Sequence, residues 1–288
     1  MKTNAIIRIV LFSLAIFILG SILLGVVTFD LFSFESHSVT VREENRVSCA
    51  MQSNFVANAS EIQHLDIEWA AGSITILPDS GSDQIFIQES PVSSEKYAMH
   101  VNQSGNKLKI EFCKEDVFHI GINDNEFDAK DLVISVPADW ICNSLEIDAA
   151  AADVMVSGLT IREMDFDGAS GICTFDNCQI EKLDMDTASG DVEFSGTLDT
   201  LDFDAMSARF TGDFRNAPKR LDIDSMSGDL EIYLPEESGF RLTLDALSGG
   251  FHSDFATYMQ GDSYCYGDEY CCISVNAMSG DVAVYKAK

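Results

Sequence analysis

Two stretches of this sequence decide the fold: LDMDTASGDVEF at residues 183–194 and LDIDSMSGDLEI at residues 221–232. Both run apolar, acid, apolar, acid, and then continue through a small or flexible residue and a Ser-Gly corner into a second alternating run. Six further copies begin at Leu65, Leu145, Met164, Leu201, Leu242 and Ile273. The starts at 145, 164, 183, 201, 221 and 242 are 19, 19, 18, 20 and 21 residues apart, which is typical of a repeat protein.

Each copy is predicted to form two short strands that meet at a corner. Successive side chains of a strand point to opposite faces, so Leu183 and Met185 are expected to face inward while Asp184 and Asp186 face outward. One copy cannot bury its apolar side alone, whereas stacked copies form a continuous core. The pattern therefore predicts an all-β fold, a parallel β-helix or β-solenoid of about 19 residues per coil. An antiparallel sandwich fits less well, because only stacking explains why each position keeps its residue type.

Residues 85–137 interrupt the period. The runs IFIQ, YAMHV, KLKIEF and LVISVP predict antiparallel strands that cap or flank the first coil, with a hairpin turn at Ser104-Gly105-Asn106. Residues 30–60 are polar and predict a linker. The expected organisation is an N-terminal segment at 1–29, this linker, and a β-solenoid domain at 61–288 with its main repeats in 145–288.

The N-terminal segment contains an uncharged run of 19 residues, IVLFSLAIFILGSILLGVV, at 9–27. At about 1.5 Å per residue, a helix of this length nearly spans a hydrocarbon core of about 30 Å. A cleaved signal peptide is the rival interpretation, but the run is longer than the usual apolar region and no good cleavage site follows it. Lys2 and Arg8 precede the run and Asp30 follows it. We therefore expect a single-pass membrane helix with a cytoplasmic N-terminus and an extracytoplasmic C-terminal domain at the cell membrane.

The charge balance excludes some partners. Lys and Arg number 18 against 47 Asp and Glu, a formal net charge of −29, so binding to nucleic acid or to anionic lipid head groups is not expected. Hydrophobic residues make up 46% of the chain and the acids are interspersed, which argues against intrinsic disorder.

Three features resemble a bacterial adhesin-like family of β-strand-repeat domains of unknown function: the SGDV and SGDL corners, VISVP at 133–137, and IYLPEESGF at 232–240. The resemblance covers roughly Leu65 to Lys288. It implies a β-helical extracytoplasmic domain, often tethered by one N-terminal helix, with some relatives encoded near cell-envelope stress-response systems. It supplies no catalytic residues. Ala152 and Ala208 replace the corner Gly in two copies, so those coils are expected to be less regular.

Stacking would align the outward acids in two columns. Within a column, acids of neighbouring coils would lie about 4.8 Å apart, a distance at which two unit charges repel by roughly 0.9 kcal/mol in water. Clustered carboxylates of this kind can hold Ca²⁺ or another hard cation. The competing interpretation, which we favour, is a solvated face that keeps the solenoid soluble. The candidate cation ligands are Asp165, Asp167, Asp184, Asp186, Asp202, Asp204, Asp222 and Asp224. No other metal site and no cofactor is expected.

A serine also recurs at each corner. A nucleophilic serine needs one uniquely placed activating base, which repetition does not supply, so stacked hydroxyls that satisfy the corner are expected instead. The column comprises Ser170, Ser189, Ser207, Ser227, Ser248 and Ser279.

The interval from Leu242 to Ile273 is longer than the repeat and contains the segment YCYGDEYCC. We expect a protruding loop that is either stabilised by a disulfide from Cys265 to Cys271 or Cys272, in an oxidising exterior, or simply reduced. The cysteine spacing is poor for zinc. The candidate partner contacts in this loop are Tyr258, Tyr264, Tyr266 and Tyr270. Cys173 takes an inward position and is predicted to be buried.

Two functions remain open. The first is a membrane-anchored scaffold, adhesion or cell-envelope sensing module without catalytic activity, whose partners would be envelope proteins or glycans. The second is a carbohydrate-active enzyme on a β-helix that uses a pair of carboxylates. A single activity lost on one carboxylate change would favour the second.

Overall fold

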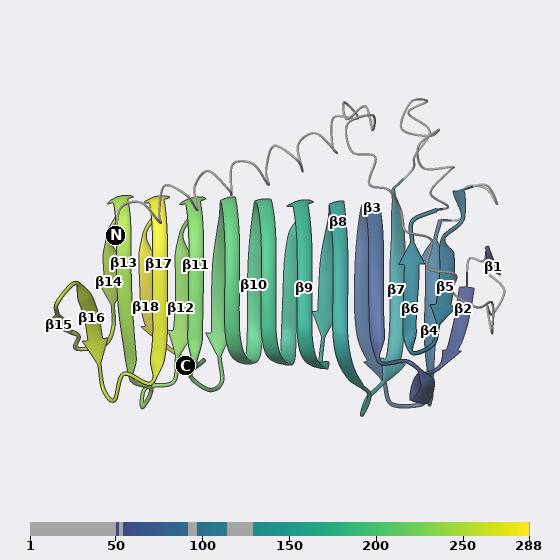
Figure 1. The fold of residues 1–288 in the computed structure, drawn as a ribbon, viewed down its shortest axis with the longest axis horizontal. Coiled ribbons are helices and arrows are strands. Elements are labelled where there is room, and N and C mark those ends of the chain that lie inside the picture. Colours follow the sequence, from purple (N-terminus) through teal and green to yellow (C-terminus); the bar gives the residue numbers. More distant parts are fainter. Residues whose placement is uncertain (1–49, 52–53, 92–96, 114–128, 288) are drawn as a thin grey trace, which may run out of the picture.

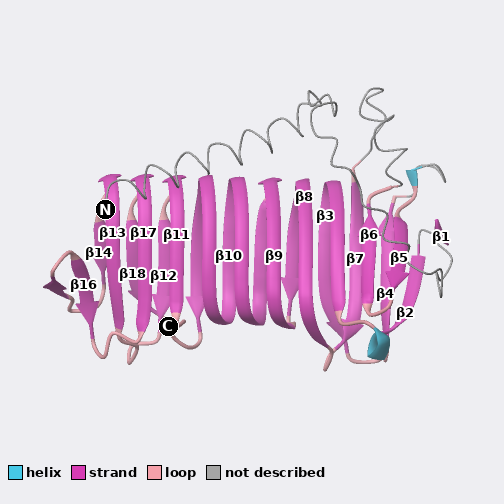
Figure 2. Ribbon diagram, viewed as in Figure 1, coloured by secondary structure: helices cyan, strands magenta, loops and turns pink. Residues whose placement is uncertain are grey.

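A computed structural model describes residues 50–51, 54–91, 97–113 and 129–287, and these are almost entirely strand (Figure 2), with one short 3-10 helix, η1 (Ala59–Glu61). The strands are β1 (Ala50–Met51), β2 (Asn54–Asn58), β3 (His64–Asp79), β4 (Gln84–Ser90), β5 (His100–Ser104), β6 (Lys107–Glu111), β7 (Lys130–Pro137), β8 (Ile141–Ser157), β9 (Thr160–Ser170), β10 (Ile172–Phe214), β11 (Arg220–Ser227), β12 (Leu230–Leu234), β13 (Phe240–Ser248), β14 (Phe251–Ser253), β15 (Tyr258–Gln260), β16 (Ser263–Tyr266), β17 (Cys271–Ser279) and β18 (Val282–Lys286).

The predicted membrane helix at 9–27 and Cys49 lie outside the described residues. Within the described part of the chain, no helix has the length and apolar character needed to cross a bilayer.

The repeats stack in parallel, as the sequence predicted. Each repeat forms one rung with two arms: a first arm that carries the alternating acids, and a second arm that follows the Ser-Gly corner. Leu145 lies opposite Met164, Met164 opposite Leu183, and Leu201 opposite Leu221, so equivalent residues are neighbours. Figure 1 shows the rungs side by side along the long axis, from β1 and β2 at one end to β15 and β16 at the other. The all-β, solenoid-like fold is therefore confirmed.

The order of rungs along the axis departs from the order in the chain at both ends. The last repeat, β17–β18, lies between β11–β12 and β13–β14 and pairs in parallel with both, as the position of β17 in Figure 1 shows. At the other end, β3 lies between β8 and the β6–β7 pair, again in parallel. At the C-terminal end the chain builds the outermost rung, β13–β14, first and then returns inside it, whereas at the other end the inner strand β3 precedes the outer rung of β6 and β7. Consequently the last strand of the chain has partners on both edges.

The flanking section is antiparallel only in part. As predicted, β5 pairs antiparallel with β6 and β4 antiparallel with β7, and these strands cover the end of the stack. The prediction did not include a second set of partners: β6, from KLKIEF, and β7, from LVISVP, also pair in parallel with β3 and complete a rung of their own. Residues 54–58, assigned above to the linker, form β2, which pairs antiparallel with β4. At the opposite end β16 and β15 add antiparallel strands to β13.

The core is a continuous apolar column between the two arms. Leu183, Leu201 and Leu221 are at most 2% exposed, and Cys173 is buried as predicted. Aromatic rings fill the space between arms and rungs: the centroids of Phe203 and Phe210 lie 5.3 Å apart. Because every rung covers its neighbour's apolar face, burial grows with each added repeat.

The Ser-Gly corners combine a backbone conformation that favours glycine with a serine hydroxyl. Gly228 has φ +138°, and a Cβ there would lie 1.8 Å from the carbonyl oxygen of Ala208 on the neighbouring rung. The predicted serine role is confirmed where the hydroxyl donates to a neighbouring rung's carbonyl. The pairs are Ser189 to Ala169 (3.2 Å), Ser227 to Met206 (3.4 Å), Ser248 to Met278 (3.2 Å) and Ser279 to Met226 (3.5 Å). Ala152 and Ala208 take the corner without a positive φ.

A buried ion pair that the sequence analysis missed secures the β1–β7 end of the stack. The Lys130 ammonium donates to Glu89 at 2.7 Å and to the carbonyl oxygens of Tyr97 (2.8 Å) and Phe112 (2.5 Å). The Trp69 indole N–H donates to the Lys130 carbonyl at 2.9 Å. Burial lowers the pKa of Lys130, and its three acceptors compensate the buried charge. This network joins β3, β4, β6 and β7.

Candidate functional site

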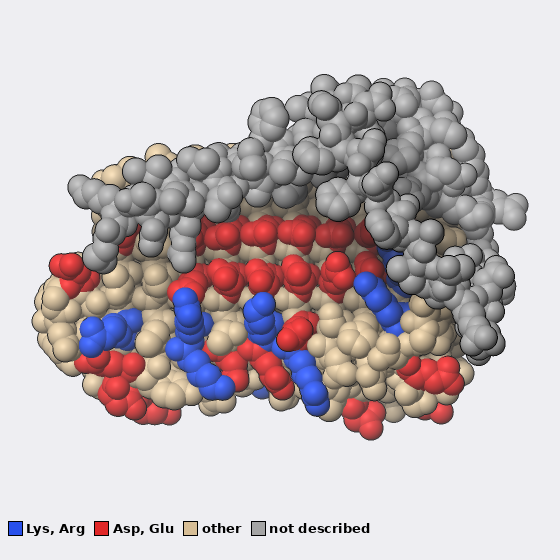
Figure 3. Space-filling view, in the orientation of Figure 1, with Lys and Arg blue, Asp and Glu red and all other residues tan. Residues whose placement is uncertain are grey.

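The outward side of the first arms is the most distinctive surface of the molecule, and we call it the acidic face. Its two columns run across six rungs and are visible as two red rows in Figure 3. The first column is Asp66, Glu146, Asp165, Asp184, Asp202 and Asp222; the second is Glu68, Asp148, Asp167, Asp186, Asp204 and Asp224. The structure therefore brings together all eight predicted cation ligands. It also adds Asp66 and Glu68, because the outlying copy at Leu65 pairs directly with the copy at Leu145.

The second column is electrostatically strained. Burial, together with the charge of Asp224, raises the pKa of Asp204 to about 7. Burial and Asp167 raise the pKa of both Asp148 and Asp186 to about 6. Both causes disfavour the ionised form. Part of this column therefore carries protons near neutral pH.

Basic side chains balance the first column but not the middle of the second. Lys107 pairs with Asp66 at 2.7 Å, Lys182 with Asp184 at 3.3 Å, and Arg220 with Asp222. Four residues of the second column have no ion pair or hydrogen bond with any described side chain or backbone group: Asp148, Asp167, Asp186 and Asp204. The unbalanced charge is thus concentrated along one line.

The acidic face does not form a metal centre in the structure. The described residues contain no group of three or more His, Cys, Asp or Glu side chains arranged to hold a metal ion. Stacking sets one carboxylate per rung in each line, whereas Ca²⁺ takes six to eight oxygens converging on a point. Cation binding at these aspartates stays a prediction.

A different set of aspartates has a structural role that the sequence analysis missed. Asp229, the acid of an SGD corner, accepts a hydrogen bond from the backbone N–H of Asp281 on the next rung at 3.0 Å. Asp281 in turn accepts from Gly250 at 2.8 Å, and Asp153 accepts from Ile172 at 2.9 Å. The recurrence of Asp directly after Ser-Gly was the signal available in the sequence.

The tyrosines of the predicted partner loop divide into two pairs. Tyr264 stacks on Phe251 with centroids 4.3 Å apart, and Tyr266 packs on Phe255 at 4.8 Å, so these two cover the end of the core. Tyr258 and Tyr270 are 50% and 53% exposed. The loop is therefore a cap over β13 and β14, and only the second pair is available for a partner.

Of the two expected states of this cap, disulfide-bonded or reduced, the structure has the reduced one. Cys265 and Cys271 are buried, Cys272 is exposed, and none of the cysteines in the described ranges forms a disulfide. Arg241 of β13 lies opposite Cys265 on one side and opposite Cys272 on the other. An intervening strand separates cysteines by about 9.6 Å, beyond the Cα separation of about 7 Å that a disulfide spans.

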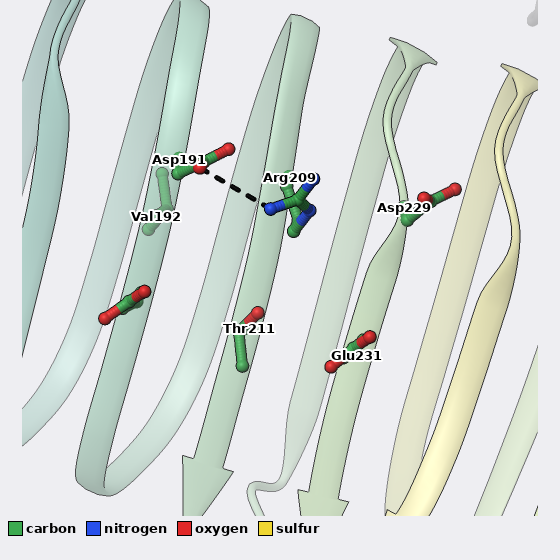
Figure 4. Close-up of a pocket in the computed structure, with 7 residues that line it drawn as sticks. Asp191, Val192, Arg209, Thr211, Asp229 and Glu231 are labelled. Carbon is green, nitrogen blue, oxygen red and sulfur yellow. Dashed lines mark ion pairs between the residues drawn. The ribbon is translucent and has the colours of Figure 1, made fainter.

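The second arms carry a polar depression that sequence reasoning did not find. It has a volume of about 340 Å³ and is lined by Asp191, Val192, Glu193, Arg209, Thr211, Asp229 and Glu231. Figure 4 shows Arg209 facing Asp191, with which it forms an ion pair of 3.6 Å. Arg209 occupies the position that Asp191 and Asp229 hold in the neighbouring corners, so a cation replaces an acid there.

A family model and several solved structures match this chain. No curated protein matches the sequence. A candidate cell adhesion protein of Clostridium sporogenes is similar with a TM-score of 0.35 and 11% identity, over 81% of this chain and 97% of that one. A candidate adhesin of Bacteroides fragilis is similar with a TM-score of 0.47 and 12% identity, over 82% of this chain and 97% of that one. A candidate lipid-binding protein of Parabacteroides distasonis is similar with a TM-score of 0.36 and 12% identity, over 82% of this chain and 96% of that one. The model of the Toastrack DUF4097 family matches residues 62–285, which is almost the whole stack. This chain belongs to the Toastrack DUF4097 family, in agreement with the adhesin-like resemblance of its repeats.

Proposed function

We propose that this protein is a membrane-anchored, extracytoplasmic scaffold or adhesion module that works by binding cell-envelope components and has no catalytic activity. The observation that carries the proposal is the uniformity of the acidic face, where the same residue types recur on six rungs. Catalysis needs one combination of groups at one place. A repeated surface instead offers many equivalent contacts, each weak alone and strong in sum.

The sequence of the N-terminal segment supports the anchoring part of this proposal. The uncharged run at 9–27 follows Lys2 and Arg8 and precedes a strongly acidic domain, the charge order expected when the domain is exported. In that position the stack would face other envelope proteins and glycans, whether for adhesion or for sensing the state of the envelope.

Localisation can be tested on the full chain carrying a C-terminal epitope tag. We expect the tag in the membrane fraction and digestible by protease added to intact spheroplasts. A variant lacking residues 1–29 is expected to leave the membrane fraction. A tag that is protected from protease, or a full chain that is soluble, would refute the anchored extracytoplasmic arrangement.

A glycan-hydrolysis screen tests the absence of catalysis. We expect no turnover of neutral or acidic polysaccharides. Turnover that is lost on a single carboxylate change, for example Glu231→Gln in the second-arm depression, would replace this proposal with a carbohydrate-active enzyme.

A further inference from the structure

Three aromatic side chains lie together on the outer side of the second arms, near the C-terminal end of the stack. Tyr233 of β12 lies directly opposite Tyr285 of β18, with ring centroids 5.2 Å apart and planes inclined by 34°. The ring of His252 on β14 lies 5.8 Å from that of Tyr285. In β12 the outward Tyr233 alternates with the buried Ile232 and Leu234, so its ring faces away from the core. We call these three side chains the aromatic platform.

The platform adjoins the polar depression of Figure 4. The Tyr233 hydroxyl donates to Glu231 at 3.1 Å, and Glu231 also lines the depression. In the neighbouring row, Ala283 lies between Glu231 and His252, so the smallest side chain separates the depression from the platform's end. Partly exposed aromatic rings and hydrogen-bonding groups are therefore adjacent on one surface.

This combination fits one ligand chemistry well. A pyranose ring has an apolar C–H face that packs on an aromatic ring, and hydroxyls that carboxylates and a guanidinium bind in pairs. The depression holds the carboxylates of Asp191, Glu193, Asp229 and Glu231 against a single cation, Arg209. Its negative charge disfavours uronic acids, sulfated sugars and other anionic glycans.

We propose that the aromatic platform and the adjoining depression form a binding site for a neutral or N-acetylated oligosaccharide. The proposal rests on the binding role proposed above and gives that role a ligand class and a place. Sugar rings stack on Tyr233 and Tyr285, while their hydroxyls are bound by Glu231, Thr211 and Arg209. A purely structural cross-strand pair would stabilise the sheet without binding anything.

Calorimetric titration of the full chain separates these cases, with the detergent chosen to lack a sugar head group. The probes are tetra-N-acetylchitotetraose and cellotetraose, with tetragalacturonate as the anionic comparison. We expect one or both neutral probes to bind and tetragalacturonate not to bind. Tyr285→Ala should weaken binding about tenfold, or about 1.4 kcal/mol. Tyr285→Phe, which keeps the ring, should bind as the parent does.

Phe86→Ala is the matched control, because Phe86 is an exposed aromatic on β4, at the opposite end of the stack from the platform (Figure 1). It should leave the affinity unchanged. The proposal is overturned if neither neutral probe binds at millimolar concentration, or if Tyr285→Ala binds as tightly as the parent. It is also overturned if a lysine-rich peptide binds the platform and the oligosaccharides do not. If the chain still cross-links to an envelope protein in cells but binds no oligosaccharide, the platform assignment fails while the scaffold role stands.

Discussion

Asp204 on a first arm and Asp229 at a corner belong to consecutive repeats, yet they meet their neighbours differently. Asp229 accepts a hydrogen bond from the next rung, so stacking satisfies it. Asp204 lies beside Asp224 and Asp186 instead, and burial together with these like charges raises its pKa to about 7. Each added repeat thus contributes hydrogen bonds at the corners and repulsion between carboxylates on the acidic face. The corner aspartates stabilise the stack, whereas the acidic face destabilises it. The recurrence of acids on that face therefore points to a role in function rather than in folding.

The largest effect is expected from a change at the corner backbone. Gly228→Ala would place a methyl group 1.8 Å from a carbonyl oxygen of the neighbouring rung, at φ +138°. We expect a loss of about 4 kcal/mol in the free energy of unfolding, because the two rungs must separate locally. Urea denaturation followed by circular dichroism measures it.

Gly105→Ala is the matched control, since Gly105 also has a positive φ but has nothing within 4 Å of an added Cβ. We expect a loss of about 1 kcal/mol there, from the left-handed conformation alone. Equal losses at both glycines would show that contact between rungs does not set the corner.

Exchanging the two kinds of aspartate should change stability in opposite directions. Asp229→Ala removes the acceptor of the Asp281 N–H and should cost about 1 kcal/mol. Asp204→Asn removes one like charge from a column and should stabilise the protein by about 0.5 kcal/mol at pH 8. Thermal denaturation of both variants at pH 8 compares them. A loss of stability in both would contradict the distinction between corner and face.

The acidic face should make stability fall as pH rises. The folded pKa of Asp204, about 7, and those of Asp148 and Asp186, about 6, lie above the unfolded value of about 3.9. The folded state therefore holds more protons between about pH 4 and pH 7, so the free energy of unfolding increases as pH falls through this window. Denaturant midpoints at pH 8 and pH 5 test this. A higher denaturant midpoint at pH 8 than at pH 5 would refute the raised pKa values. So would an Asp204→Asn variant whose midpoint changes with pH as much as that of the parent.

Divalent cations should produce the smallest effect. Because no three described side chains converge on a metal position, CaCl₂ and MgCl₂ at equal millimolar concentration should raise the midpoint equally, through screening of the columns. A rise specific to calcium, lost in a double Asp186→Asn and Asp204→Asn variant, would instead establish the cation site that the acid pattern predicted.

Local pattern was enough to predict the rungs and the two acidic columns, because alternation and period act over a few residues at a time. It could not predict that β17 lies between β11 and β13. All copies have nearly the same inward residues, so Ile273 fits beside Leu221 or Leu242 equally well, and the order of rungs depends on loop lengths and end caps. The same limit applies to β6 and β7, which form one rung although they are separated in sequence.

Surface features likewise divide into those set by the local repeat and those set by the order of the rungs. The columns follow from a period, but the aromatic platform joins β12 with β18, which are neighbours only because of the inserted rung. The Lys130–Glu89 pair likewise joins β7 and β4 across an interval of 41 residues. The disulfide alternative meets the same limit, since Cys265 and Cys272 are close in sequence but have β13 between them. Sites and contacts that depend on the order of the strands could not be predicted from the sequence.

Disulfide cross-linking across the C-terminal rungs tests the stacking order most directly. In a Cys272→Ser background, cysteines would replace Asp222, Ser274 and Thr243 two at a time. Ser274 lies opposite Asp222 on one side and Thr243 on the other, about 4.8 Å from each, whereas Asp222 and Thr243 are about twice as far apart. We predict that the two pairs containing position 274 cross-link under mild oxidation and that the 222–243 pair does not. Rapid cross-linking of the 222–243 pair, with none at 274, would contradict it.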